Sequence, residues 1–543
     1  MLFLVRVSFF GDQLLAQLSV GGSPPSFSYN ISRDQETVVS VPAPDLADVR
    51  SEDSLYPSPY CFGMVIPVEV NPENTGSWIT LPDGTETWRV MIKAPGALAL
   101  TAYFDRFHIP EGGKLFLYNP DKSQVIGAYT SLNNSASGYF ATELIAGEEM
   151  ILEYSGIKGT DNRPVIHLNE IAYAYRGVDF LERDSYDNLL SSGCEVNVNC
   201  PEGNLWQYQK DGITKIQVKR DNRTYWCSGS VINNTSLDRT PYILTANHCG
   251  YNSTDQELQM WIFYFNYEAP TCVNQYPKPR SLTGAVVKAH SGNQLIAGSD
   301  FYLVRMNEII PDSFHVFYNG WSRAEDFPSP SGVGIHHPNG DIKKISTYTT
   351  QLVSTTWEGS SNETHWQVTW AQTQNGHGVT EGGSSGSPIF DNHGRIIGNL
   401  SGGLSACDSA SLNSADFYGK FSYSWASNGS SADLRLRDWL DPTSSNVFTL
   451  EGVYLGIDEP KMQKTLLVYP NPFENIVRIK TSMASGYLKI TIFDLPGRVV
   501  LSDRVHLLDE EPVKMDVGSL PRGIYLLKAE SASSVFIRKI IKE

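Results

Sequence analysis

The chain has 543 residues, of which 41% are apolar, and its formal net charge is −17. This length is typical of about three or four domains, and no run of 18 or more apolar residues predicts a transmembrane helix. The acidic balance argues against a nucleic-acid partner, which normally meets a basic face, and it would attract a cationic substrate.

The N-terminal third divides into two zones. Residues 1–55 are rich in Ser, Pro and Asp and show little periodicity, which predicts a leader and a poorly ordered segment. Their first residues, MLFLVRVSFFGDQLLAQLSVGG, have the mildly apolar character of a signal-peptide remnant whose true start lies elsewhere. Residues 56–183 contain alternating runs such as TWRVMIKA, KLFLYN and EMILEYSGI, separated by turn residues. These runs predict an all-β sandwich.

Strand-like runs continue through the rest of the chain. Residues 184–450 contain KIQVKR, QMWIFYFNY and FYLVRM, and one helical stretch, SADLRLRDWLDP, near their end. Residues 451–465 have the composition of a linker. Residues 466–543 alternate again, in runs such as YLKITIFDLPGRVVL and LPRGIYLLKAE, which predicts a small β-sandwich of the Ig-like type. The predicted fold class is therefore all-β throughout.

Six of the seven cysteines lie close together in the sequence, whereas Cys61 stands apart. An even, clustered set favours disulfides and an oxidising compartment, although counting alone allows 15 pairings. Zinc is the competing interpretation, but no close Cys-x-x-Cys ligand pair occurs, and we expect no metal and no cofactor. The clustered residues are Cys194, Cys200, Cys227, Cys249, Cys272 and Cys407.

Three segments of residues 184–450 contain the residue types of a serine hydrolase. YILTANHCG ends a strand-like run at His248, AGSDFYLVRM places Asp300 before another, and EGGSSGSPIF contains a serine among glycines. A serine needs a histidine to take its proton during attack, and a buried aspartate holds that histidine in the right tautomer. Each motif alone has a bland interpretation as a cap, a turn or a loop, but together they predict nucleophilic catalysis.

The same segments resemble the chymotrypsin-like serine peptidases, and more closely their bacterial lysyl endopeptidase branch. CSGSVINNT, GIHHPNGDIKKIS and GGSSGSPIF extend the resemblance over about Cys194 to Asp441. It implies a double β-barrel with His248, Asp300 and Ser385 as catalytic residues and with the amides of Gly383 and Ser385 as the oxyanion hole. It also implies the disulfides Cys194–Cys407, Cys200–Cys272 and Cys227–Cys249.

The chain differs from the pancreatic relatives at the position before the nucleophile. Their nucleophile follows an Asp that pairs with a new N-terminus, whereas Ser384 stands there in this chain. We therefore expect that an N-terminal ammonium does not switch this site on.

The resemblance also implies how the substrate is chosen. The position of the trypsin specificity Asp holds Val379, and the lysyl branch instead uses a carboxylate two residues before a Tyr-Gly pair, which is Asp416 here. A single carboxylate suits a compact ammonium, whereas Arg favours a fork of acceptors. By itself Asp416 would be read as a solvated loop charge.

Further substrate-binding residues follow from the same comparison of motifs. Trp357 matches a tryptophan that packs by the site in the branch, although it could equally be a core residue. Ser401, Gly402 and Gly403 form the substrate strand, where the branch's type member has a histidine in place of Ser401. This departure leaves the turnover and the pH optimum open.

The adjacent pair His336 and His337 invites a metal hypothesis. Neighbouring side chains on a strand point to opposite faces, so they cannot easily share one ion. We therefore predict structural roles for both histidines.

The flanking zones suggest an exported proenzyme. YPNPF, DLPGRVV and LPRGIYLLK resemble the C-terminal sorting domain of the type IX secretion system of Bacteroidetes, which implies release or surface anchoring outside the cell. Residues 56–183 would be a propeptide. No lysine lies between Lys158 and Lys210, so we expect a separate maturation protease, plausibly Arg-specific, that cuts near Arg183.

The resulting hypothesis is a secreted, monomeric serine endopeptidase that cleaves proteins or peptides after lysine. Arg-specific or broader cleavage is the alternative, and a catalytically inactive adhesin is a third reading, against which the complete set of His248, Asp300 and Ser385 counts.

Overall fold

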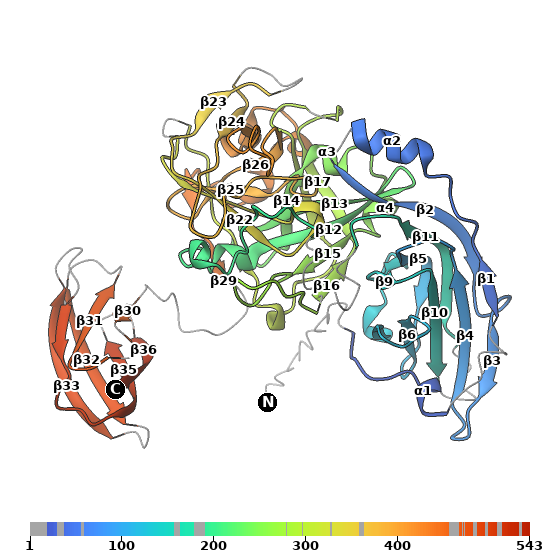
Figure 1. The fold of residues 1–543 in the computed structure, drawn as a ribbon, viewed down its shortest axis with the longest axis horizontal. Helices are drawn as coiled ribbons and strands as arrows, with labels where there is room; N and C mark the ends of the chain where they lie inside the picture. Colours follow the sequence, from blue (N-terminus) through green and yellow to red (C-terminus); the bar gives the residue numbers. More distant parts are fainter. Residues whose placement is uncertain are drawn as a thin grey trace, which may run out of the picture. The chain divides into compact units, whose positions relative to one another are not determined.

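The computed structural model describes most of the chain, which divides into two compact units, Met1–Leu455 and Gly456–Glu543 (Figure 1). The described residues are 19–29, 37–55, 59–156, 163–178, 190–278, 280–295, 297–325, 328–357, 363–454, 466–469, 471, 473–481, 486–494, 498–507, 513–530 and 535–542.

The N-terminal part of the first unit is a sandwich of two sheets. One sheet has the order β1-β4-β10-β6-β7, with β3 beside β4, and the other contains β2, β11, β5, β8 and β9. Their alternating apolar residues meet in one core, as the sequence predicts. The strands are β1 (Val38–Ser40), β2 (Tyr60–Val70), β3 (Ser77–Thr80), β4 (Glu86–Lys93), β5 (Ala99–His108), β6 (Lys114–Tyr118), β7 (Val125–Tyr129), β8 (Phe140–Ala141), β9 (Ile145–Ala146), β10 (Glu149–Gly156) and β11 (Val165–Ala174).

The segment before residue 56 is more regular than expected. It contains α1 (Ser26–Tyr29) and α2 (Ala47–Leu55), and β1 pairs in parallel with β4. Val41 and Val49 are buried in the sandwich core, which explains why this Ser- and Pro-rich stretch folds. Most of the predicted signal-peptide remnant, residues 1–18 of 1–22, lies outside the described residues.

The second sheet of the sandwich continues into residues 190–454, which we call the catalytic region. Strand β13 pairs with β12 along its length, while Arg223–Trp226 pair with β2 and Ser230–Ile232 with β14. The strand order of the whole sheet is β16-β15-β12-β13-β2-β11-β5-β8. In addition, β14 pairs with β13 and β18, and β18 pairs with β17. These strands are β12 (Ile213–Arg220), β13 (Arg223–Ile232), β14 (Tyr242–Ala246), β15 (Ile262–Phe265), β16 (Arg280–Thr283), β17 (Ala285–His290) and β18 (Phe301–Met306).

A second sheet of the catalytic region has the order β22-β21-β25-β26-β27-β24-β23, and β20 pairs with β26 and β28. A tryptophan-rich cluster fills one side of this sheet. The strands are β19 (Phe317–Tyr318), β20 (Trp321–Ser322), β21 (Gly332–His336), β22 (Lys344–Tyr348), β23 (Val353–Thr355), β24 (His365–Val368), β25 (Pro388–Phe390), β26 (Ile396–Gly403), β27 (Asp416–Lys420), β28 (Thr449–Leu450) and β29 (Val453–Tyr454).

Helices in the catalytic region are short: α3 (Asn247–Gly250), α4 (Asp255–Leu258), α5 (Phe421–Ala426) and α6 (Arg437–Leu440). The predicted helical stretch near residue 437 is the 3-10 turn Ala432–Leu434 followed by α6. The predicted linker begins later than expected, because β29 pairs with β19 and belongs to the catalytic region.

The second unit is a small sandwich of two antiparallel sheets around one core. Their orders are β30-β31-β34 and β33-β32-β35-β36. The strands are β30 (Leu466–Tyr469), β31 (Ile476–Thr481), β32 (Gly486–Asp494), β33 (Val499–Leu507), β34 (Val513–Asp516), β35 (Gly523–Glu530) and β36 (Val535–Lys542).

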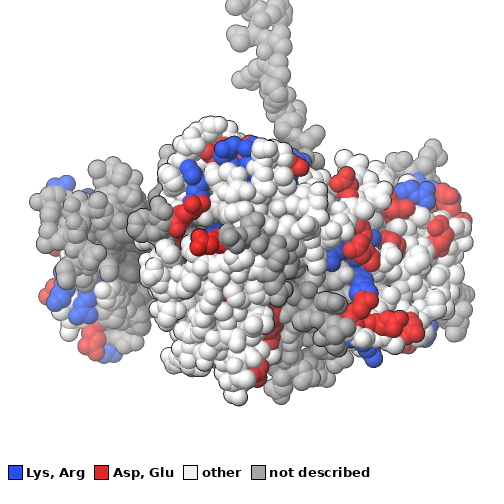
Figure 2. Space-filling view, turned by 90° about the horizontal axis from the view of Figure 1, so that it is seen from above, with Lys and Arg blue, Asp and Glu red and all other residues white. Residues whose placement is uncertain are grey.

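Among the described residues, no helix is both long and apolar enough to cross a membrane. On the face seen in Figure 2, acidic and basic side chains are interspersed, and much of the surface carries neither. On this face the charged side chains of both signs lie in several separate groups.

Candidate active site

His248 and Asp300 meet at the ends of two paired strands. His248 lies in α3, directly after β14, and Asp300 directly precedes β18, which pairs with β14. The Nδ1 atom of His248 lies 2.8 Å from Oδ2 of Asp300, and the His248 amide donates to Oδ1 over 3.0 Å. Both side chains are buried. The carboxylate thus fixes the ring and the tautomer that carries its proton on Nδ1.

The remaining nitrogen of His248 is set up to accept a proton. Its Nε2 atom is buried and has no hydrogen-bond partner among the described residues. Behind Asp300, its carbonyl accepts from the Asn247 amide at 2.9 Å and from Nδ2 of Asn399 at 2.8 Å. Asp300 adopts a positive φ of 52°, a conformation that these contacts hold in place.

Ser385 lies in a tight loop that packs against the strand leading to His248. Gly383 and Gly386 on either side have φ of 88° and 81°. A Cβ atom on Gly386 would lie 2.1 Å from Oγ1 of Thr245, so only glycine allows this approach. The Ser385 carbonyl accepts from the Ser228 amide at 2.8 Å. The loop therefore brings Ser385 to the same end of β14 as His248.

The predicted oxyanion donors lie in this loop. The amides of Ser384, Gly386 and Ser387 donate to backbone carbonyls, whereas that of Gly383 has no partner in the described part of the chain. An unsatisfied backbone amide in this loop is a group that could donate to an oxyanion.

Asp416 is fully buried beneath the substrate strand. Its Oδ2 atom accepts from Nε1 of Trp370 at 2.6 Å, from Oγ1 of Thr380 at 2.8 Å and from Oγ of Ser405 at 2.6 Å. The Ser405 amide donates to Oδ1 over 3.1 Å. Burial raises the pKa of this carboxyl, while the surrounding donors oppose the rise. Asp416 is therefore not the solvated loop charge that the sequence alone would suggest.

Glycine allows close packing against this carboxylate. Gly403 pairs with Asp416 across β26 and β27, and a Cβ atom on it would lie 1.8 Å from Oδ1 of Asp416. Gly419 follows in β27, where a Cβ atom would lie 1.7 Å from the Ser299 carbonyl. The Tyr-Gly pair in this motif thus lets β27 pack directly behind the segment that carries Asp300.

Trp357 and Ser401 lie on opposite sides of the substrate strand's end. The Trp357 ring stacks on Phe417 with centroids 4.3 Å apart, and a Cβ atom on Gly402 would lie 3.3 Å from it. Ser401 is buried and bonds to Nε2 of His365 at 2.9 Å. A histidine therefore does contact this position, but β24 supplies it.

The sequence did not single out the residues that surround these groups. His365 lies near Asp300 and Lys420, and its burial lowers its pKa to about 4, so it is neutral at neutral pH. Trp370, Thr380 and Ser405, which donate to Asp416, come from three separate segments. Only their three-dimensional proximity identifies them, since none belongs to a spacing motif.

The histidine pair His336 and His337 is divided between different partners. His336 bonds to Ser384 and His337 to the Asp341 carbonyl, each at 2.8–2.9 Å. Among the described residues, no group of three or more potential ligands could hold a metal ion.

The structure joins Cys194 to Cys407, Cys200 to Cys272 and Cys227 to Cys249. The third pair lies directly behind the site, because Cys249 follows His248. Cys61 is a buried thiol of β2.

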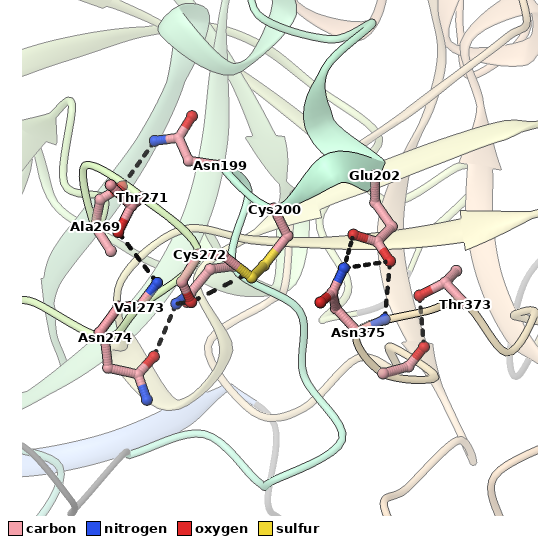
Figure 3. The surroundings of a disulfide bond; sticks show 12 residues. Asn199, Cys200, Glu202, Ala269, Thr271, Cys272, Val273, Asn274, Thr373 and Asn375 are labelled. Carbon is pink, nitrogen blue, oxygen red and sulfur yellow. Dashed lines mark hydrogen bonds between the residues drawn. A yellow bond between two sulfur atoms is a disulfide. The ribbon is translucent and has the colours of Figure 1, made fainter.

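The second disulfide fixes the start of the catalytic region against two loops (Figure 3). Next to it, Nδ2 of Asn199 donates to the Ala269 carbonyl at 2.7 Å. The carboxylate of Glu202 accepts from the Asn375 amide at 3.0 Å.

Two family models match parts of the chain. Residues 190–419 match the family model of the lysyl endopeptidase C-terminal domain, and residues 467–543 match that of the secretion system C-terminal sorting domain. A lysyl endopeptidase of Pseudomonas aeruginosa is 27% identical over 371 residues, which cover 64% of this chain and 75% of the relative.

Solved serine proteases are more distant. The thermostable serine protease AL20 from an extremophilic microorganism is 15% identical with a TM-score of 0.29, covering 39% of this chain and 91% of that one. A Glu endopeptidase is 16% identical with a TM-score of 0.27, covering 43% of this chain and 94% of that one.

The sorting domain marks the chain for export by the type IX secretion system. The chain is a serine endopeptidase whose residues 190–419 match the lysyl endopeptidase C-terminal domain and whose residues 467–543 match the sorting domain.

Proposed function

We propose that the enzyme cleaves peptide bonds after lysine, with Ser385 as nucleophile, His248 as general base and Asp300 as its partner. The hydrogen bond between His248 and the buried Asp300 is the observation that carries this proposal. It leaves Nε2 of His248 as the atom that takes the Ser385 proton.

The reaction would proceed through an acyl-enzyme. Ser385 Oγ attacks the carbonyl carbon while His248 takes its proton, and the amides of Gly383 and Ser385 donate to the oxyanion. His248 then gives the proton to the leaving amine, and water hydrolyses the ester by the same route in reverse. Each oxyanion donor contributes a factor of roughly 10² to 10³ in rate.

The choice of lysine follows from the donors around Asp416. A carboxylate oxygen has about two lone-pair sites, and Oδ2 already accepts three hydrogen bonds. Oδ1 accepts one and lies on the side of Gly403. One acceptor suits a compact ammonium, whereas a guanidinium favours two parallel bonds to both oxygens.

The proposed enzyme is one part of a longer precursor. Residues 56–183 would be a propeptide, residues 184–450 the peptidase and residues 466–543 the sorting domain of an enzyme that acts as a monomer. The junction at residues 179–189, including Arg183, lies outside the described residues. A separate protease would cut it, because a lysine-specific enzyme finds no lysine there.

Covalent labelling tests the assignment of the nucleophile. We expect a fluorophosphonate to modify Ser385 and no other residue, and Ser385→Ala to lose both labelling and activity by about six orders of magnitude in kcat, with unchanged thermal unfolding. An adduct on Ser384 or Ser387 would contradict the assignment, and a complete lack of labelling would favour the inactive adhesin.

A further inference from the structure

Ser384, the residue before the nucleophile, is tied to a buried histidine. His336 ends β21 and is fully buried. Its Nδ1 atom lies 2.8 Å from Oγ of Ser384, and its Nε2 atom lies 3.0 Å from Oγ of Ser346 on the paired strand β22. One ring thus bridges the catalytic loop and the sheet beneath it.

Each group in this series of hydrogen bonds donates to the next, from Ser384 through His336 to Ser346. Ser346 donates its single hydroxyl proton to the Val379 carbonyl at 2.8 Å, so it must accept from Nε2–H of His336. Nδ1 is then an acceptor, and the Ser384 hydroxyl donates to it. Ser384 Oγ in turn accepts from the Glu381 amide at 3.2 Å. The ring is therefore neutral, in keeping with burial, which lowers its pKa to about 3.

Residues next to His336 hold the backbone of the same loop. The Asn339 amide donates to the Gly382 carbonyl at 2.5 Å. Oγ of Ser228 donates to the Gly383 carbonyl at 2.9 Å and accepts from the His337 amide at 2.9 Å. The segment from His336 to Asn339, together with Ser228, thus forms hydrogen bonds to three successive residues of the loop, Gly382, Gly383 and Ser384.

We propose that His336 is a positioning residue which, through the Ser384 hydroxyl, holds the amides of Gly383 and Ser385 in the geometry of an oxyanion hole. The inference rests on the proposed function, because it assumes that Ser385 is the nucleophile. In the pancreatic relatives, an ion pair with the new N-terminus orders this loop. In this chain, the neutral hydrogen bonds between Ser384, His336 and Ser346 take that role. The site is therefore formed without a charge supplied by cleavage.

Two substitutions of His336 separate the two ends of the relay. Asn presents an oxygen near the place of Nδ1 and can still accept from Ser384, whereas Gln presents a nitrogen near the place of Nε2 and keeps only the bond to Ser346. We expect His336→Gln and Ser384→Ala to lower kcat by about tenfold to a hundredfold, below the loss of a whole oxyanion donor. His336→Asn should retain several-fold more activity than His336→Gln.

The measurement is kcat and KM on a lysyl peptide p-nitroanilide, with active sites titrated by a fluorophosphonate. KM should change less than twofold, because the relay contacts no substrate. His167→Gln is the matched control: this histidine of β11 also bonds to two side chains, Asp105 and Glu69, but it lies in the N-terminal sandwich. Its kcat should stay within twofold of wild type.

Equal losses in His336→Asn and His336→Gln, or a wild-type kcat in Ser384→Ala, would overturn the proposal. Ser384→Ala removes only one oxygen atom. Its kcat therefore tests the proposal even if the histidine variants do not fold. Failure of the proposed function is distinguishable, since the wild-type enzyme would then not be labelled on Ser385.

Discussion

At the scale of single residues, the four donors around Asp416 define what the carboxylate can still bind. These hydrogen bonds offset the free-energy cost of burying the carboxylate, so it can remain buried without a bound substrate. They also leave Oδ1 as the atom with a vacant lone pair, next to the Cα atom of Gly403. Specificity would thus come from a single hydrogen-bond acceptor.

We predict that Asp416→Asn lowers kcat/KM for lysyl substrates by about two orders of magnitude, or roughly 3 kcal/mol, because the substrate ammonium loses its buried partner. The measurement compares lysyl and arginyl p-nitroanilides. Asp408→Asn is the control, since Asp408 is exposed and only caps a turn. An unchanged lysine preference in Asp416→Asn would mean that another group reads the side chain.

Some of the site was predictable from sequence, because the chemistry demands particular residue types. His248, Asp300 and the GGSSGSP loop were identified in this way. The histidine contacting Ser401 was not, because His365 reaches it across the sheet from β24. A linear pattern does not contain contacts between strands that are distant in sequence.

At the scale of elements, the N-terminal sandwich and the catalytic region share a sheet. The ladder between β2 and β13 runs from Arg223 opposite Met64 to Trp226 opposite Tyr60. Beside it, Phe62 stacks on Trp226 with centroids 4.2 Å apart. This contact is as well packed as a domain core, so we expect the N-terminal sandwich to influence the stability of the catalytic region.

Glu143 gives this interface a pH dependence. It accepts from Oγ of Ser281 on β16 at 2.7 Å, and burial raises its pKa to about 7. The folded chain therefore holds a proton that the unfolded chain has released between about pH 4.3 and pH 7. The stabilisation is fully present below that window and is lost as the pH rises through 7, by at most about 4 kcal/mol.

We predict that the Tm of the Ser385→Ala protein, which cannot digest itself, falls by a few degrees between pH 5 and pH 8, and that adding Glu143→Gln removes most of this fall. Calorimetry at both pH values measures it. A fall of the same size in the double variant would assign the pH dependence to other groups.

The shared sheet could not be predicted from the sequence. Alternation identified β4, β6, β10, β12 and β18 as strands, and the structure confirms the all-β fold class. Alternation does not choose a strand's partner, however, because β2 could pair with any exposed edge. The residues around β1 also lack a regular alternation of apolar and polar side chains, so the pairing of β1 with β4 gave no periodic signal.

At the scale of the whole molecule, the order of parts implies a sequence of events. The sorting domain acts in export, and the junction between the sandwich and the catalytic region contains no lysine. The proposed specificity therefore forbids self-cleavage at that junction, whatever the concentration of the enzyme.

We predict that the wild-type chain, made in a host without secreted Arg-specific proteases, stays uncut between residues 177 and 193. N-terminal sequencing of the wild type and of Ser385→Ala is the measurement. A new N-terminus in this range that appears only in the wild type would show autocatalytic maturation and would exclude strict lysine specificity.

The central claim is that this serine endopeptidase cuts after lysine. Its most direct test is mass spectrometry of the peptides that the purified enzyme releases from a denatured protein mixture, with Ser385→Ala as the blank. We expect nearly all new C-termini to be lysine, because Asp416 presents one free acceptor to an ammonium. Arginine in a comparable share, or C-termini without a preferred residue, would contradict the claim.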